Sequence, residues 1–404
     1  MVKSSYIQAY RTKRIHHAIG LMSGTSLDGV DGVLLEIVSD DEANVRSVNV
    51  LKRATIGYSA EMRQRMEALC TPGGSDTVEF NAAHIAVAHW YAHVVKELIQ
   101  NSKVNVDIIG MHGQTIWHEP NGVMYPLPNG PGLVRGTFQL GNPLVLSYLT
   151  DIPVVSDFRN IDIAAGGQGA PLAPYIDHLL FAIEGKGVAV QNIGGIGNVT
   201  VLPAHGGKNG IIAFDTGPGN MIIDAVVQWG TDGTARYDNN GEIAAKGTVD
   251  EEWLSQLMKD PYFAKTPPKS TGREVYGRVF VEGFVAEGQR RGRSFEDMVA
   301  TATALTARSI SSAYKAFVLS HTPLHRTIIS GGGARNATLM KMIASEVDGE
   351  VLSSTDLGVL DIDREAMAFA LMAHASMMGE SSNLPAVTGA KKPLVLGTVT
   401  MDQL

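Results

Sequence analysis

The sequence contains very little cysteine, because Cys70 is the only one in 404 residues. A single thiol excludes an intrachain disulfide and a zinc site built from several cysteines. Long apolar runs are also missing, and no stretch approaches the roughly 20 residues of a membrane-spanning helix. With 44% hydrophobic residues, the composition predicts a soluble globular protein large enough for two domains. Because no secretory signal stands at the start, we expect a cytoplasmic location.

Charge and nucleotide-binding motifs set further limits. The formal net charge is −8 and no basic stripe offsets it, so we expect no nucleic-acid partner. Neither a Walker A motif nor a complete G-x-G-x-x-G occurs in the chain. Any nucleotide must therefore be held by another arrangement of backbone groups. Residues 1–14 are basic and lack an apolar core, and we expect a frayed arm there.

Small and polar residues are concentrated between two apolar runs near the N-terminus. Residues 18–22 and 33–37 are predicted strands, and the tip between them holds Ser23, Gly24, Thr25, Ser26, Asp28 and Gly29. Such a tip can bring N–H groups and hydroxyls close to phosphates, because glycine has no Cβ in the way. Asp28 and Asp31 could hold a hydrated Mg²⁺ beside those phosphates. The alternative is an ordinary hydrophilic turn.

The second half of the chain repeats this form. Strands are predicted at 188–191 and 199–202, with the Gly-rich turn 192–198 between them. A third strand, 211–214, leads directly into Asp215 and a Gly/Pro turn. An aspartate at a strand end is held rigidly and partly desolvated, which suits a general base. The alternative is a turn or helix-capping aspartate, the more frequent role of a lone Asp.

A third Gly-rich turn follows a predicted strand at 327–329. Its residues are Gly331, Gly332 and Gly333, with Asn336 before the next helix. Glycines between a strand and a helix let a flat ring lie against the backbone, as an adenosine pocket requires. One such turn is weak support alone. Two hairpin tips combined with it follow the scheme of the actin, sugar-kinase and heat-shock ATPase superfamily.

Other segments suggest helices, loops and a hinge. Helices are predicted at 59–69, 76–100 and 363–378, and Ser294 with Asp297 resembles a capping box that starts another. Residues 120–136 are rich in Pro and Gly and are predicted to be a loop. Residues 165–171 are interpreted as a hinge and part of a substrate wall. Residues 266–274 are either a solvated loop or a flap.

Two histidine patterns leave their roles open. His112 follows a buried predicted strand, where α/β folds place site residues, and it is equally consistent with a structural histidine. His89 and His93 have a spacing that could suit a metal, but no third ligand is evident. We therefore expect these two to be partly exposed helix residues.

Eight motifs in order closely resemble the anhydro-N-acetylmuramic acid kinases, over nearly the whole chain. They are G-L-M-S-G-T-S-L-D-G-V-D (20–31), H-G-Q-T (112–115), D-F-R (157–159), G-G-Q-G-A-P-L (166–172), N-I-G-G-I-G-N (192–198), F-D-T-G-P-G-N (214–220), P-K-S-T-G-R-E (268–274) and G-G-G-A-R-N (331–336). The departures are a longer N-terminal arm and a longer loop at 121–136.

The resemblance implies a cytoplasmic enzyme of peptidoglycan recycling. Such an enzyme converts 1,6-anhydro-N-acetylmuramic acid, ATP and water to N-acetylmuramic acid 6-phosphate and ADP. Asp215 matches the catalytic base, which would deprotonate the water that attacks the anomeric carbon. Residues 24–31 match the ATP-binding segment, and Mg²⁺ is expected at Asp28 through water.

The resemblance also completes the expected site. The residues expected to bind ATP are Gly24, Thr25, Ser26, Leu27, Asp28, Gly29, Val30, Asp31, Asn192, Gly194, Gly195, Gly197, Asn198, Gly331, Gly332, Gly333 and Asn336. The residues expected to bind the sugar are Arg159, Gly167, Gln168, Thr216, Gly217 and Glu365.

The expected architecture is α/β, a two-domain actin-like ATPase (ribonuclease H-like) fold with an interdomain cleft. Residues 1–160 and 363–404 would form one domain and residues 161–362 the other. A homodimer is expected, although no motif carries this expectation. Two other functions are considered: a kinase for a different amino-sugar acceptor on the same scaffold, and a nucleotide-gated assembly or chaperone-like protein.

Overall fold

The computed structural model describes residues 2–40 and 44–401, and the chain divides into two compact units. Unit 1 comprises residues 1–180 and 362–404, and unit 2 comprises residues 181–361. The boundary predicted after residue 160 lies inside unit 1, because two interactions tie the following segment to the C-terminal part. Asn383 donates a hydrogen bond to Asp162, and Arg364 pairs with Asp177.

Unit 1 is built on a mixed sheet in the order β12-β6-β4-β1-β2-β3, with β5 paired to β4. β1 and β2 are antiparallel, as are β2 and β3, whereas β4 runs parallel to β1 and β6 runs parallel to β4. The strands are β1 (Ile15–Ser23), β2 (Gly29–Ser39), β3 (Val45–Gly57), β4 (Ile108–Leu127), β5 (Gly130–Leu140), β6 (Val154–Ser156) and β12 (Thr398–Thr400). The predicted first hairpin is confirmed.

Capping residues and apolar stripes determine where the helices of unit 1 begin and which face they bury. They are α1 (Val2–Arg11), α2 (Ala60–Leu69), α3 (Thr77–Ile99), α4 (Pro143–Thr150), α5 (Asn160–Ala164), α6 (Ala173–Phe181), α14 (Asp361–Met378) and α15 (Pro385–Thr388). Asp76 caps α3 by accepting hydrogen bonds from the N–H groups of residues 78 and 79. Val87, Val94 and Leu98 of α3 are fully buried against the sheet.

Helix α14 approaches the sheet at two glycines that pair across β1 and β4. Gly20 lies opposite Gly110 in the parallel register. A Cβ on Gly20 would lie 1.8 Å from the carbonyl oxygen of Ala366, and one on Gly110 would lie 2.0 Å from that of Phe369. Only glycine therefore permits this helix-to-strand distance.

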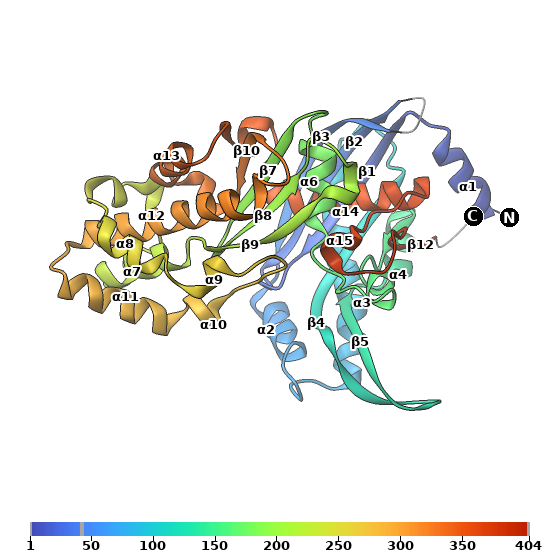
Figure 1. The fold of residues 1–404 in the computed structure, drawn as a ribbon. Coiled ribbons are helices and arrows are strands. Elements are labelled where there is room, and N and C mark those ends of the chain that lie inside the picture. The colour runs from blue at the N-terminus through green and yellow to red at the C-terminus, as the bar shows by residue number, and fades with distance from the viewer. Residues whose placement is uncertain (1, 41–43, 402–404) are drawn as a thin grey trace. The chain divides into compact units, whose positions relative to one another are not determined.

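Unit 2 repeats the strand order in a second sheet, β11-β10-β7-β8-β9 (Figure 1). Its strands are β7 (Gly187–Ile193), β8 (Ile196–Leu202), β9 (Ile212–Pro218), β10 (Leu324–Ser330) and β11 (Glu350–Ser353). Its helices are α7 (Met221–Gly230), α8 (Glu251–Leu257), α9 (Pro261–Ala264), α10 (Arg273–Tyr276), α11 (Arg278–Arg290), α12 (Phe295–Ala313) and α13 (Ala337–Glu346). The predicted second hairpin is confirmed, with a turn shorter than 192–198.

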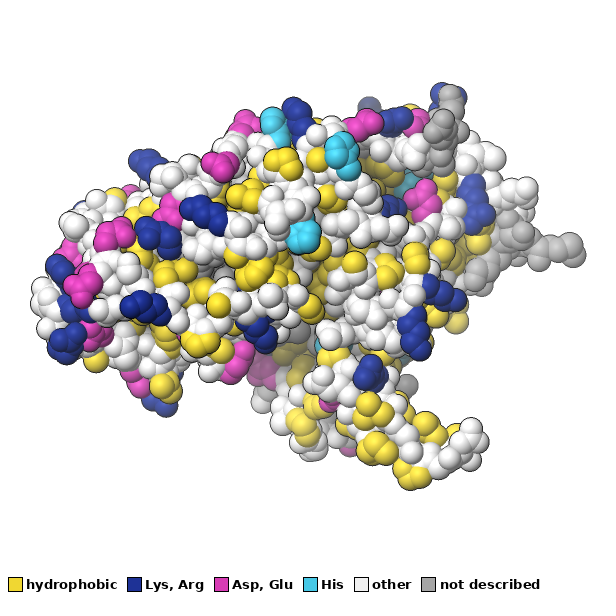
Figure 2. Space-filling model, in the orientation of Figure 1, with side chains coloured by type: hydrophobic (Ala, Val, Ile, Leu, Met, Phe, Trp, Pro, Cys, Tyr) yellow, Lys and Arg dark blue, Asp and Glu magenta, His cyan; other side chains and the backbone are white. Residues whose placement is uncertain are grey.

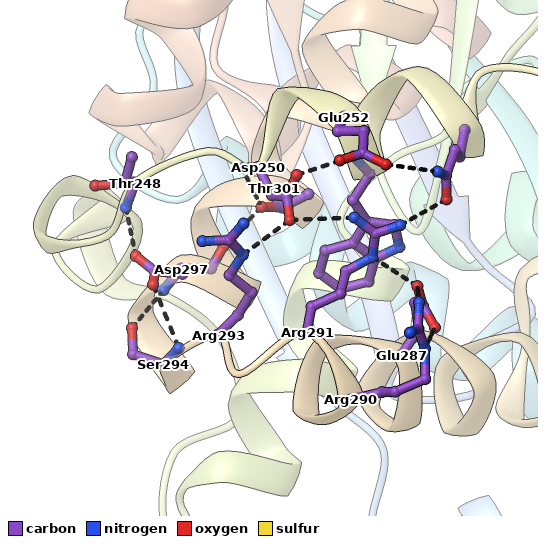
Figure 3. A network of polar contacts seen from close by, with 12 residues as sticks. Thr248, Asp250, Glu252, Glu287, Arg290, Arg291, Arg293, Ser294, Asp297 and Thr301 are labelled. Atoms are coloured by element: carbon purple, nitrogen blue, oxygen red, sulfur yellow. Dashed lines mark hydrogen bonds and ion pairs between the residues drawn. The ribbon is translucent and has the colours of Figure 1, made fainter.

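A network of caps and ion pairs joins α8, α11 and α12 (Figure 3). Ser294 and Asp297 form the predicted capping box at the start of α12. Asp250 accepts a hydrogen bond from the Trp253 N–H at 2.9 Å and one from Arg293 Nε at 2.8 Å. These contacts, led by the Trp253 N–H, lower the pKa of the Asp250 carboxyl. The network therefore holds α8, α11 and α12 of unit 2 against one another.

The predicted loop at residues 120–136 is wrong, because this segment is part of the long β4–β5 hairpin. Proline and glycine predicted a break, but a two-stranded ribbon at a sheet edge tolerates both residues. The ribbon projects from the unit 1 sheet and carries many exposed apolar side chains (Figures 1 and 2). They belong to Trp117, Val123, Met124, Tyr125, Leu127, Leu133, Val134 and Phe138.

The predicted frayed arm at the N-terminus is also wrong, because residues 2–11 form α1. Tyr10 is only 2% exposed, and its hydroxyl lies 2.8 Å from His374 Nδ1. Arg11 Nε donates a hydrogen bond to the carbonyl of Met377 at 2.8 Å. Both partners belong to α14, so tertiary contacts stabilise a helix that its own sequence only weakly favours.

We predict that Gly110→Ala destabilises the protein by at least about 1–3 kcal/mol, the range for overpacked cores. The added methyl group would collide with the α14 backbone at Phe369. Urea unfolding followed by circular dichroism measures the effect. Gly136→Ala in the neighbouring β5 is the control, because no atom lies within 4 Å of its added Cβ. Equal stability of the two variants would contradict the packing argument.

Candidate functional site

The β1–β2 tip is an open arrangement of backbone and hydroxyl groups. Thr25 and Ser26 are exposed, and the Ser26 hydroxyl donates a hydrogen bond to Asp28 Oδ1 at 2.8 Å. Gln114 Nε2 donates to the Gly24 carbonyl at 2.8 Å and fixes the start of the tip. The nearest atom to a Cβ on Gly24 would lie 3.7 Å away, so packing does not require glycine there.

Other residues of the predicted ATP-binding segment have packing roles. Leu27 and Val30 are buried in the unit 1 core. Gly29 faces the Ile56 carbonyl, where a Cβ would come within 2.4 Å. Asp31 Oδ1 accepts a hydrogen bond from the Thr55 hydroxyl at 2.6 Å. Beyond Gly24 to Ser26, only Asp28 therefore offers an exposed polar side chain at the tip.

The tip shares a cavity of about 320 Å³ with the expected sugar-binding pair, Arg159 and Glu365. Met22, His112 and Thr115 complete its lining. Arg159 comes from the segment after β6, Glu365 from the first turns of α14 and His112 from β4. The structure thus brings together residues that are more than 300 positions apart in the sequence (24 and 365).

His112 holds Arg159 in place. Arg159 Nε and Nη2 lie 3.1 and 3.0 Å from His112 Nε2, and Arg159 Nη1 donates to the Gly169 carbonyl at 2.8 Å. Because guanidinium only donates, His112 Nε2 must accept, so its proton lies on Nδ1, 3.4 Å from the Ser23 carbonyl. The ring also packs on Phe369, with centroids 4.6 Å apart.

Burial shifts the pKa of each of the three ionisable side chains in this cavity, His112, Arg159 and Glu365. Burial, with the Arg159 charge beside it, lowers the pKa of His112 from 6.5 to about 3. Burial also lowers the pKa of Arg159, against the opposing effect of Glu365. The pKa of Glu365 is raised by burial, which outweighs Arg364 and Arg159. A neutral histidine therefore orients a cation toward a partly desolvated carboxyl.

The segment 165–171, with Gly167 and Gln168, is folded around a buried carboxylate that the sequence did not indicate. Asp162 accepts hydrogen bonds from the Gly169 N–H, Asn383 Nδ2 and the Thr388 hydroxyl. A Cβ on Gly167 would lie 2.2 Å from Asp162 Oδ2. Gln168 is exposed, and its N–H donates to the Thr388 carbonyl. The close backbone approach of this Gly-rich segment thus occurs against Asp162.

The β7–β8 tip contacts the start of α7. The Gly194 carbonyl accepts a hydrogen bond from the Asn220 N–H at 2.7 Å, and the Gly195 carbonyl accepts from Gly219 and Met221. Gly195 is exposed, and a Cβ there would lie 3.4 Å from its nearest neighbour, an ordinary contact. This tip is therefore rigid yet open.

An apolar cavity of about 820 Å³ begins at Gly195 and runs between α7 and α11. Met221 and Trp229 of α7 and Val281 and Val285 of α11 line it, together with Asp224. Burial raises the pKa of the Asp224 carboxyl to about 6. This cavity lies wholly within unit 2.

The third Gly-rich turn packs against the same tip. A Cβ on Gly331 would lie 2.7 Å from Asn192 Oδ1, and one on Gly333 would lie 2.4 Å from the Ile193 side chain. Gly332 is the most open of the three, with Asn220 Nδ2 at 3.3 Å from an added Cβ. Asn336 is buried and caps α13 through the Leu339 N–H. Only part of this predicted adenosine turn therefore presents open backbone.

Asp215 is the central residue of β9, opposite Asn198 in the β8–β9 register, so it does not stand at the strand end that the sequence predicted. Its Oδ2 accepts a hydrogen bond from the Thr271 N–H at 3.0 Å, and its own N–H donates to the Lys269 carbonyl at 3.1 Å. Burial raises the pKa of the Asp215 carboxyl, the Thr271 N–H lowers it, and Glu274 and Lys269 act in opposite directions. A fixed, half-buried carboxylate of this kind can accept a proton from a bound water.

The neighbours of Asp215 in the predicted sugar-binding set are structural. Thr216 is fully buried, and its hydroxyl accepts a hydrogen bond from Gln191 Nε2 at 3.2 Å. Gly217 has φ +150°, and a Cβ would meet Phe263 at 2.9 Å. Gly197 faces the Thr216 hydroxyl, where a Cβ would lie 2.8 Å away. Thr216 and Gly217 could therefore contact a ligand only through their backbone groups.

Metal ligands are sparse. Within residues 2–40 and 44–401, no cluster of three or more His, Cys, Asp or Glu side chains could hold a metal ion. Mg²⁺ needs only one or two carboxylates when phosphates and water complete its shell. The exposed Asp28 carboxylate at the β1–β2 tip fits that requirement. In the same described part of the chain, no helix is long and apolar enough to span a membrane.

Sequence reasoning missed or left open several groups at these sites. His112 was undecided, and the structure assigns it to the cavity with Arg159. Thr115 was not singled out beyond its motif. The segment 266–274 was interpreted as a solvated loop or a flap, but its Lys269 is only 5% exposed and its Thr271 binds Asp215. In the sequence, the only indication of an ordered segment was that Lys269 follows two prolines and precedes Gly272.

The two sheets define the class of this protein. In each unit the first three strands are antiparallel neighbours, and two later strands extend the sheet beside the first, β4 and β6 in unit 1 and β10 and β11 in unit 2. This is the duplicated arrangement of actin-like ATPases and sugar kinases. The α/β fold expected from the sequence is confirmed. The model of the anhydro-N-acetylmuramic acid kinase family matches residues 16–402. The chain belongs to this family.

Curated relatives agree with this assignment. The anhydro-N-acetylmuramic acid kinase of Caldanaerobacter subterraneus is 39% identical over 95% of this chain and 96% of its own length. That of Clostridioides difficile is 38% identical over 95% and 98%, respectively. Among solved structures, the xylulose kinase of Lactobacillus acidophilus covers 96% of this chain and 94% of its own with 9% identity and a TM-score of 0.45.

We predict that His112 makes stability depend on acid. The pKa of His112 is 6.5 in the unfolded chain and about 3 in the folded protein. Between these pH values the unfolded chain binds more protons than the folded protein, so the free energy of unfolding decreases as the pH falls through this range. From pH 7 to pH 5 this group contributes a loss of about 2 kcal/mol. His112→Gln, which keeps an acceptor for Arg159 but does not titrate, should lose correspondingly less stability.

Urea unfolding at pH 7 and pH 5 measures this difference. His89→Gln on the exposed surface of α3 is the matched control. A wild-type and a His112→Gln protein with the same loss between the two pH values would show that His112 protonates freely in the folded state.

Proposed function

We propose that this protein is an ATP-dependent kinase that hydrolyses the 1,6-anhydro ring of 1,6-anhydro-N-acetylmuramic acid and phosphorylates the sugar to N-acetylmuramic acid 6-phosphate. This is the role in peptidoglycan recycling that its family membership supports. The observation that carries the proposal is Asp215, a half-buried carboxylate held by the Thr271 N–H in a chain of this family.

Asp215 acts as the general base of the proposed reaction. Its carboxylate takes a proton from a water whose oxygen bonds to the anomeric carbon, while the bond from that carbon to O6 breaks. O6 then bonds to the γ-phosphorus as the bond to the β–γ bridging oxygen breaks and ADP leaves. The transition state develops oxocarbenium character at the sugar and dispersed charge at the phosphoryl group.

Backbone groups at each hairpin tip are proposed to bind the triphosphate. Gly24 to Ser26 offer N–H groups and hydroxyls, and Gly195 offers its N–H, whereas the Gly194 N–H already donates to the Ile196 carbonyl. Mg²⁺, held through water by Asp28, would neutralise phosphate charge. Gly332 and the apolar cavity that begins at Gly195 offer a place for the nucleoside.

Arg159 and Glu365 are proposed to contact the sugar. Their cavity contains the N–H donors of the fixed Arg159 guanidinium. It also contains the Glu365 carboxyl, whose pKa is raised by burial. Gln168 adds an exposed amide from the folded segment 165–171. Thr216 and Gly217 would contribute through their backbone positions beside Asp215.

The proposed enzyme works in the cytoplasm, where its ATP is supplied, and as a homodimer. The exposed apolar side chains of the β4–β5 hairpin support association between copies (Figure 2). Sedimentation at micromolar concentration measures the oligomeric state, and a monomer at all concentrations would remove the dimer from the proposal.

The direct test is incubation with ATP, Mg²⁺ and the anhydro sugar. We expect sugar-dependent release of ADP and one 6-phosphosugar that contains an oxygen from water at its anomeric carbon. A panel of other amino sugars tests acceptor choice. ADP release without any sugar, or with another acceptor only, would overturn the proposed reaction.

We predict that Asp215→Asn lowers kcat by at least about 10²-fold, the lower range for losing a general base. ATP binding, measured by calorimetry, should be retained because the amide preserves shape. Asp232→Asn, on the exposed surface of the same unit, is the control and should keep wild-type activity. Near-normal turnover of Asp215→Asn would remove Asp215 from the role of base.

We predict that Gly24→Ala and Gly195→Ala each raise the KM for ATP at least about 10-fold, the equivalent of roughly one charge-assisted hydrogen bond. A methyl group at either position meets no protein atom closer than 3.4 Å, so the melting temperature should be unchanged. Gly136→Ala again serves as the control. Unchanged KM values in both variants would show that phosphates do not approach these tips.

A further inference from the structure

Lys269 is a buried cation without a carboxylate partner in the described chain. It lies between α9 and α10 and is only 5% exposed. Its Nζ donates hydrogen bonds to the carbonyls of Tyr262 and Phe263, each at 3.3 Å. No ion pair joins it to an acid among residues 2–40 and 44–401. Lysine is rarely buried this far without a specific reason.

Three aromatic rings surround the ammonium group. Nζ lies 4.8 Å from the ring centroids of Tyr262 and Phe317 and 5.9 Å from that of Phe214. These distances are within the range of cation–π attraction. Phe214 directly precedes Asp215, so the ammonium binds to the end of β9 as well as to α9.

The backbone of the same segment holds Asp215 on two sides. The Lys269 carbonyl accepts the Asp215 N–H at 3.1 Å, and the Thr271 N–H donates to Asp215 Oδ2 at 3.0 Å. Tyr262, whose ring and carbonyl both contact the ammonium, also donates its hydroxyl to the Asp215 carbonyl at 2.8 Å. The polar groups that contact Asp215 in these three bonds therefore belong either to the segment 269–271 or to Tyr262, which the ammonium contacts.

The charge of Lys269 also acts on the carboxylate directly. Burial raises the pKa of the Asp215 carboxyl, and the Lys269 charge is one of the smaller influences that oppose this rise; burial likewise lowers the pKa of Lys269, which Asp215 opposes. An apolar side chain could fill an aromatic pocket without the desolvation penalty of an ammonium group. The rings and the two carbonyls offset part of this penalty, but no carboxylate among the described residues pairs with the ammonium group.

We propose that Lys269 is a positioning residue that clamps the segment 269–271 on Asp215 and keeps this carboxylate ionised to accept the proton of the attacking water. The inference rests on the proposed function, in which Asp215 is the base. It adds a residue that touches neither substrate but determines the geometry and ionisation of the group that does.

The test compares Lys269→Met, which keeps the length of the side chain without its charge, with Lys269→Arg, which keeps the charge. For Lys269→Met we expect kcat to fall at least about 10-fold, with the KM for ATP unchanged within about twofold. The acidic limb of its pH–kcat profile should move to higher pH, since removing a cation raises the pKa of a nearby carboxyl. Lys269→Arg should restore the position of this limb.

Two measurements separate this inference from the proposed reaction. Titration of the Asp215 carboxyl by ¹³C NMR, assigned with Asp215→Asn, needs no activity and should show a higher pKa in Lys269→Met. Lys259→Met, at an exposed position in the turn after α8, is the control and should change neither readout. An unchanged Asp215 titration and an unmoved acidic limb would overturn the role of Lys269, even if kcat fell through loss of stability.

Inactivity of the wild-type protein toward the anhydro sugar would overturn the proposed reaction instead. In that case the NMR titration would still decide whether Lys269 controls the ionisation of Asp215. Circular dichroism at the assay temperature verifies that each variant is folded.

Discussion

Unit 1 depends on the close approach of α14 to the sheet at Gly20 and Gly110. Because the α14 backbone lies directly on β1 and β4, the side chains of this helix reach groups at several places in the unit. Glu365 enters the cavity beside the β1–β2 tip, and Phe369 supports the ring of His112. Farther along, His374 and Met377 provide the contacts that stabilise α1. A packing distance set by two missing methyl groups thus positions both a site and a terminal helix.

The two units solve the problem of a desolvated polar site in different ways. In unit 1, a neutral histidine accepts hydrogen bonds from Arg159, so one charge is oriented without being cancelled. In unit 2, a cation held by rings and carbonyls influences Asp215 without an ion pair between them, and the described protein contact to the Asp215 carboxylate is the Thr271 N–H. Both arrangements avoid a direct ion pair, which would occupy the groups that a ligand must reach.

Local pattern was sufficient for much of the fold. The two hairpins, the strand β9, the capping box of α12 and the long helices α3 and α14 were predicted, because apolar periodicity and turn chemistry act over a few residues. The predicted end of β9 at residue 214 was wrong, because the strand continues through Asp215 to Pro218. The prediction was wrong where context decides. Proline and glycine at 120–136 belong to a paired ribbon, and residues 2–11 are helical because α14 holds them.

The candidate site divides in the same way. Glycines at positions 24 and 195 are open, as expected for ligand approach, whereas Gly29, Gly197 and Gly333 serve packing that no single sequence could reveal. The pairing of His112 with Arg159 and of Lys269 with Asp215 joins segments 47 and 54 residues apart (159 − 112 and 269 − 215). Residue type at one position indicates what chemistry is possible, but only the fold shows which groups meet.

The solitary thiol of Cys70 has a practical consequence. It lies at the C-terminal cap of α2, half-buried, and burial raises its pKa, so it reacts with maleimides slowly at neutral pH and faster in mild base. A fluorophore therefore attaches at one position of unit 1 without any prior mutagenesis. Ligand-induced changes around α2 can then be followed in the native chain, with one dye per molecule.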